Sequence, residues 1–152
     1  MNTKLFAFIM ILLSASVTNA ALQIDVATNK PFFQVGQAVT ISITAYNSSE
    51  TESLSLFFGT AKQATYLLDS IFDSSSIMQY AQIPSGVHIA PLTSHTWTFV
   101  HAGNASAAYP LEEGIHYVIG KIAGYGQSNP VEFAVVPEPA MLFLFSFGFL
   151  LM

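Results

Sequence analysis

The stretch Val39-Thr40-Ile41-Ser42-Ile43-Thr44-Ala45-Tyr46 decides the fold class of this chain. Apolar residues occupy every second position, and mainly hydroxyl-bearing residues fill the positions between them. Because successive side chains of a strand point to opposite faces, this alternation predicts a β-strand with one face on a core. The same period of two marks residues 22–26 and 131–135.

Five more segments have the composition of strands. They cover residues 54–58, 65–68, 77–82, 95–100 and 115–122. Clusters of Ser, Asn, Asp, Gly and Pro separate them, which is typical of turns, and no ten-residue window has the pattern of an amphipathic helix. We therefore predict an all-β, antiparallel, immunoglobulin-like β-sandwich of seven or eight strands. Trp97 and Phe99 share one face of their segment, and we expect that strand to be buried deepest.

The amino-terminal residues 1–20 have the features of a secretory signal peptide. Lys4 supplies the positive start, and residues 5–13 form an apolar run. Small residues follow, so we expect cleavage between Ala20 and Ala21. The apolar run is well short of the roughly 20 residues that span a bilayer, which favours a cleaved signal over a permanent anchor.

The carboxyl-terminal residues 137–152 begin with Pro137-Glu138-Pro139 and continue as an apolar segment. The two prolines interrupt any strand or helix that leads into it. This arrangement resembles the PEP-CTERM sorting signal. The resemblance implies recognition by exosortase, transient anchoring in the inner membrane, and delivery to the cell surface or the extracellular space of a Gram-negative bacterium. The chain departs from the signal because no Arg or Lys follows Pro139. A truncated gene model and a degraded signal both remain open as explanations.

The middle of the chain, residues 21–136, is the expected domain. Its segments 39–50, 54–63, 64–69 and 89–94 resemble the BsuPI-like intracellular proteinase inhibitor family over about residues 34–136. The resemblance implies an immunoglobulin-like sandwich and an inhibitory activity. The chain differs from the family where serines follow Asp73 and where Pro91-Leu92 replaces Pro-Gly.

The composition restricts partners and chemistry. Charged residues make up 9% of the chain, arginine is absent, and the formal net charge is −5. No basic stripe is available for a phosphate backbone, so we expect no nucleic-acid binding. The chain has no cysteine, so we expect no disulfides and no thiolate metal site.

No catalytic constellation stands out. The candidate histidines are His88, His95, His101 and His116. Their spacing fits no metal motif, and Asp69, Asp73 and the serines after them lack the spacing of a calcium loop. Adjacent strand residues point to opposite faces, so Glu112 and Glu113 do not form a carboxylate pair. We expect no enzyme activity, no cofactor and no metal.

Two functions remain open. The first is an exported structural or interaction protein, with an extracellular polysaccharide among its conceivable partners. The second is a secreted proteinase inhibitor, which would present a loop to a protease. The loop candidates are residues 83–87 and the pair Phe32-Phe33. A plug that closes one end of the sandwich is the alternative for Phe32-Phe33. The sequons at Asn47 and Asn104 carry little weight.

Overall fold

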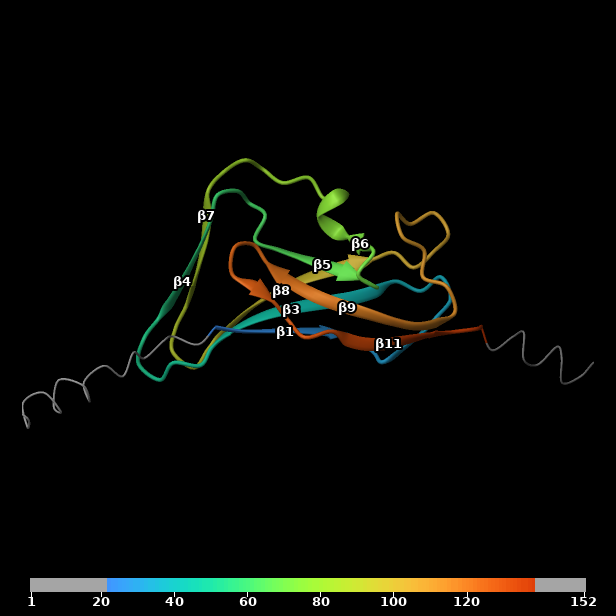
Figure 1. Ribbon diagram of the computed structural model, residues 1–152, viewed down its shortest axis with the longest axis horizontal. Coiled ribbons are helices and arrows are strands. Elements are labelled where there is room, and N and C mark those ends of the chain that lie inside the picture. Colours follow the sequence, from blue (N-terminus) through green and yellow to red (C-terminus); the bar gives the residue numbers. More distant parts are fainter. Residues whose placement is uncertain (1–21, 139–152) are drawn as a thin grey trace, which may run out of the picture.

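A computed structural model describes residues 22–138, and these residues form a sandwich of β-sheets (Figure 1). The strands are β1 (Leu22–Thr28), β2 (Phe32–Gln34), β3 (Val39–Asn47), β4 (Leu54–Phe58), β5 (Ala64–Leu68), β6 (Phe72–Asp73), β7 (Ser85–Ile89), β8 (Ser94–His101), β9 (Gly114–Ile122), β10 (Gly126–Gln127) and β11 (Val131–Val136). A single turn of 3-10 helix, η1 (Ser74–Ser76), follows β6.

The strands form three sheets. One has the order β1-β3-β8, the second has the order β2-β11-β9-β5-β6 with β10 paired to β9, and β4 pairs with β7. All pairings are antiparallel except that of β2 with β11, which is parallel. The all-β sandwich predicted from the sequence is confirmed. In Figure 1, the β4–β7 pair lies at one end of the long axis and the end of β11 at the other.

The core lies between the first two sheets, and β3 is its centre. Every second residue of β3 is buried, as its alternation predicts, and Ile41 and Ile43 have no exposed surface. From the opposite sheet, Tyr66, Val118 and Phe133 are buried in the same cluster. Each large apolar side chain removed from water in this way contributes about 1.5–3 kcal/mol.

One expected strand, residues 77–82, does not form. The chain turns before it, because the carboxylate of Asp73 accepts a hydrogen bond from the backbone N–H of Ser75 at 2.8 Å and caps η1. The hydroxyl of buried Ser74 accepts a bond from the backbone N–H of Tyr66 at 2.9 Å. The segment that follows runs without a strand partner, and Ile77 is exposed.

Four short strands lie outside the expected segments, namely β2, β6, β7 and β10. Phe32-Phe33, expected in a loop, belongs to β2, where Phe33 is buried and Phe32 is exposed. In the segment 83–87, the last three residues are the start of β7, so the free loop there is shorter than expected.

The expectation that Trp97 and Phe99 lie on the deepest strand is wrong. Both side chains are only partly buried. The reason is the position of β8 at the edge of its three-stranded sheet, where it pairs with β3 alone. The indole N–H of Trp97 donates to the side-chain oxygen of Gln63 at 2.8 Å.

Asn47, at the end of β3, joins three chain segments. Its side chain has no exposed surface. The amide nitrogen Nδ2 lies 2.7 Å from the carbonyl oxygen of Glu52 and 3.1 Å from that of Ile89, and Oδ1 accepts from the backbone N–H of Ser49 at 3.1 Å. Asn47, the first residue of one sequon, therefore has a structural role in this fold.

Candidate functional site

The expected sorting motif begins at the boundary of the folded domain. β11 ends at Val136, whose carbonyl oxygen accepts a hydrogen bond from the backbone N–H of Val35 at 3.0 Å. Pro137 follows half-buried, and Glu138 is exposed. Pro139 and the expected cleavage residues Ala20 and Ala21 lie outside the described residues. None of the helices in residues 22–138 has the length and apolar character needed to cross a membrane.

The four histidines lie in separate environments. His88 bonds through Nδ1 to the hydroxyl of Ser55 at 3.1 Å, across the β4–β7 pair. His95 packs edge-on against Trp97, with 4.5 Å between the ring centroids. His101 and His116 are both buried, and each is part of a polar network. Within the described range, no three His, Asp or Glu side chains gather in a way that could hold a metal ion.

His101 is held as the neutral ring. Its Nε2 lies 2.8 Å from the carbonyl oxygen of Tyr109, which can only accept, so Nε2 donates. Its Nδ1 lies 3.1 Å from the hydroxyl of Tyr66, which can donate to it. Burial lowers the pKa of His101, although the bond to Tyr109 opposes that shift. Burial also raises the pKa of Tyr66 to about 12, so this pair stays uncharged.

Asp69 is the centre of a second network, in the turn between β5 and β6. Its Oδ2 lies 2.8 Å from Nδ1 of His116 and 3.0 Å from the hydroxyl of Tyr109, and its Oδ1 lies 2.8 Å from the backbone N–H of Tyr117. Partial burial by itself would raise the pKa of Asp69. The hydrogen bonds and the charge of His116 outweigh this effect, so the net result is a lowered pKa.

Both nitrogens of His116 face oxygen atoms. Nε2 lies 2.8 Å from the backbone carbonyl of Glu112, and Nδ1 lies against Asp69. Both ring nitrogens are therefore engaged by acceptors within the protein, so this arrangement suits a structural tie better than a general base. The carboxylates of Glu112 and Glu113 belong to exposed residues. Glu112 therefore takes part through its backbone.

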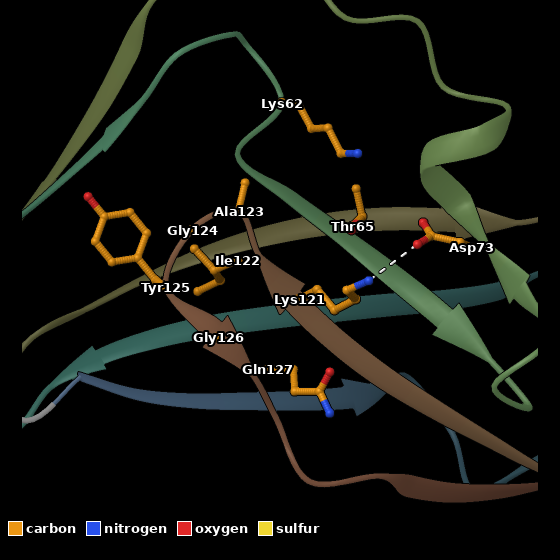
Figure 2. Close-up of a pocket in the computed structure, with 10 residues that line it drawn as sticks. All are labelled: Lys62, Thr65, Asp73, Lys121, Ile122, Ala123, Gly124, Tyr125, Gly126 and Gln127. Carbon is orange, nitrogen blue, oxygen red and sulfur yellow. Dashed lines mark hydrogen bonds and ion pairs between the residues drawn. The ribbon is translucent and has the colours of Figure 1, made fainter.

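A hollow lies above β5 and β9, beside the turn that leads into β10 (Figure 2). It measures about 350 Å³, and two lysines, Lys62 and Lys121, contribute to its wall. The Nζ atom of Lys121 lies 3.3 Å from Oδ2 of Asp73. Thr65 of β5 pairs with Lys121 of β9, so the sheet holds these two lining residues side by side. No motif in the sequence predicts that these residues come together.

Tyr125 stands at the edge of the same hollow in a fixed position (Figure 2). Its hydroxyl accepts a hydrogen bond from the backbone N–H of Phe57 at 2.7 Å. Its ring packs edge-on against Phe58, with centroids 5.7 Å apart. These contacts join the turn before β10 to the β4–β7 pair.

No protein-family model matches the chain, and no curated protein matches it. Solved structures with similar parts include the alkylpurine DNA glycosylase AlkC of Pseudomonas fluorescens, at 12% identity and a TM-score of 0.48, covering 77% of this chain and 31% of that one. The sporulation control protein Spo0M of Bacillus subtilis has 13% identity and a TM-score of 0.47, covering 80% of this chain and 51% of that one. A glucanotransferase of Paenibacillus has 13% identity and a TM-score of 0.46, covering 74% and 14%. This chain thus spans about a third of the glycosylase, and these similarities identify no function for it.

Proposed function

We propose that this chain is an exported, non-enzymatic structural or interaction protein that its carboxyl-terminal segment directs to the cell surface or extracellular matrix. The observation that carries the proposal is the position of Pro137-Glu138. The motif starts one residue after the last strand ends, and Glu138 is exposed. A processing enzyme such as exosortase would therefore reach the motif without unfolding the sandwich.

The sequence at both ends supports the same proposal. An apolar segment with a preceding lysine opens the chain, and the segment after Pro139 is almost entirely apolar. Within residues 22–138, the buried core residues run from Val26 to Val135, so trimming before Leu22 or after Glu138 removes none of them. A domain built in this way tolerates trimming at both boundaries.

Intact mass of the protein recovered from producing cells tests the proposal. We expect a mature species that begins at Ala21 and lacks residues 141–152. Glu138→Gln should block the carboxyl-terminal cut, whereas Glu113→Gln, which removes an exposed charge nearby, should leave it unchanged. A mature species that still carries residues 141–152 would contradict processing, and a protein confined to the cytoplasm in cell fractions would contradict export.

The alternative proposal is a secreted proteinase inhibitor. One observation favours it: Ile83 has 65% of its surface exposed, two positions before Ser85, whose side chain is fixed by hydrogen bonds. The hydroxyl of Ser85 donates to the carbonyl of Thr60 at 2.9 Å and accepts from Gln63 at 3.1 Å. An exposed side chain beside an anchored strand is suited to a protease cleft. Titration against a panel of serine proteases tests this, and unchanged protease activity at micromolar protein would exclude it.

A further inference from the structure

Positive charge is concentrated in one hollow of an acidic molecule. The chain has four basic residues and nine acidic ones, yet Lys62 and Lys121 both line the hollow of Figure 2. Asp73 supplies one carboxylate there. Two ammonium groups against one carboxylate leave one positive charge unbalanced, whereas the chain as a whole carries −5.

The lysine head groups retain donors for a ligand. The Nζ atom of Lys62 lies 5.8 Å from the centre of the Tyr80 ring, and no carboxylate of residues 22–138 forms an ion pair with it. Lys121 has three N–H donors, of which Asp73 takes one at 3.3 Å. Asp73 is itself occupied, because its other carboxylate oxygen accepts from Ser75 at 2.8 Å.

The rest of the hollow offers neutral polar groups and open backbone. Thr65 and Gln127 add a hydroxyl and an amide to the wall. Gly124 and Gly126, with φ angles of 81° and 136° that favour glycine, are both exposed and carry no side chain, so the backbone of this turn is open to water. Tyr125, fixed by its bonds to Phe57, is the lining residue at one end of the hollow.

We propose that this hollow binds a sugar that carries an acidic group. Lys62 and Lys121 would hold the carboxylate or phosphate, while the amide, the hydroxyl and the turn backbone would bind sugar hydroxyls. Lysine acts as a point charge and does not demand one anion geometry. The volume of about 350 Å³ is within the range of small-ligand sites. The inference deepens the proposed interaction role by naming a ligand class.

Calorimetric titration of the purified protein tests the proposal with trigalacturonic acid, glucose 6-phosphate and neutral maltotriose. We expect saturable binding of at least one acidic sugar, weaker binding at higher salt, and none of maltotriose. Lys62→Gln should weaken binding about fivefold, the scale of one charge contact near water. Lys121→Gln should weaken it more, because the Asp73 carboxylate would then face the anion unpaired.

Lys30→Gln is the matched control, since it removes the same charge from a lysine that lies over the Phe33 ring, outside the hollow. Circular dichroism and the thermal midpoint establish that each variant is folded. Equal affinity in wild type and Lys62→Gln, equal losses in Lys62→Gln and Lys30→Gln, or no binding of either acidic sugar would overturn the proposal. Binding of a thymidine oligonucleotide as tight as that of the sugars would also overturn it. The titration is independent of export and processing, so its failure would leave those tests unaffected.

Discussion

The carboxylate of Asp69 and the imidazole of His116 are joined at 2.8 Å, although 47 positions separate them in the chain. The contact ties the β5–β6 turn to β9, beside the segment that carries Glu112. Asp69 has a φ of 51°, a backbone conformation that Asp and Asn adopt more readily than most residues. The residue therefore serves both the turn and the network.

Asp69→Asn should destabilise the domain by about 1–3 kcal/mol near neutral pH, because it removes a charged acceptor from three donors, two of them in partly buried bonds. Asparagine tolerates the positive φ, so the loss reports the network and not the turn. The free energy of unfolding in urea measures it. Glu113→Gln, at an exposed carboxylate, should change stability by less than about 0.5 kcal/mol. Equal effects of the two substitutions would contradict this assignment.

The same carboxylate predicts part of the acid unfolding. The pKa of Asp69 is lowered in the fold, so its contribution to stability is present above the ordinary value of about 3.9 and is lost as the pH falls through the lowered value. Unfolding free energies measured below about pH 4 should fall less steeply in Asp69→Asn than in the wild type. An unchanged slope would show that Asp69 does not titrate with the fold.

His101 predicts a separate pH dependence in a milder range. Its pKa is lowered by burial, so the unfolded chain binds a proton first as the pH falls from about 6.5. Stability should therefore decrease below that pH. His101→Gln keeps a donor and an acceptor near Tyr109 and Tyr66 and should flatten the profile. A profile in His101→Gln as steep as that of the wild type would refute the prediction.

Asn47→Ala should cost about 1–3 kcal/mol, because the carbonyl oxygens of Glu52 and Ile89 would lose their donor in a buried place. Thermal or urea unfolding measures the loss. Asn104→Ala is the control, since Asn104 is exposed and its side chain bonds to Ser106 within its own turn. A loss at Asn47 no larger than that at Asn104 would show that the buried amide contributes little.

Gly103→Ala should destabilise the fold by about 1–3 kcal/mol through overpacking. Gly103 is buried, and a Cβ atom there would overlap the backbone carbonyl of Gln37. Gly59→Ala is the control, because Gly59 is exposed and no atom lies within 4 Å of its added Cβ. Similar thermal midpoints for the two variants would show that the chain near Gln37 relaxes freely.

The local pattern predicts seven strands of the fold, but it predicts neither the short strands β2, β6, β7 and β10 nor the order of strands in the sheets. The alternation in residues 39–46 predicts β3, because one face of that strand is buried and the other is only partly buried. The edge position of β8 depends on the order of strands in the sheet, which the period of two does not contain. Residues 77–82 have the composition of a strand, but the turn capped by Asp73 precedes them and they pair with no neighbouring strand.

The candidate sites differ in the same way: a site of contiguous residues is visible in the sequence, and a site assembled by strand pairing is not. The motif at Pro137-Glu138 was identified in the sequence because its residues are contiguous. Lys62 and Lys121 stand 59 positions apart, and only the pairing of β5 with β9 brings their surroundings together. The signal that could have identified them was their rarity, since a chain without arginine has few cations to place.

The last strand has a mechanical consequence. β11 lies between β9, which runs antiparallel to it, and β2, which runs parallel. A force applied beyond Val136 along the strand acts perpendicular to the hydrogen bonds on both sides of β11. These hydrogen bonds must then break together instead of one after another. During the transient anchoring that the sorting-signal resemblance implies, before the proposed cut, the domain would bear load in shear, and the force would be shared between the two neighbouring strands.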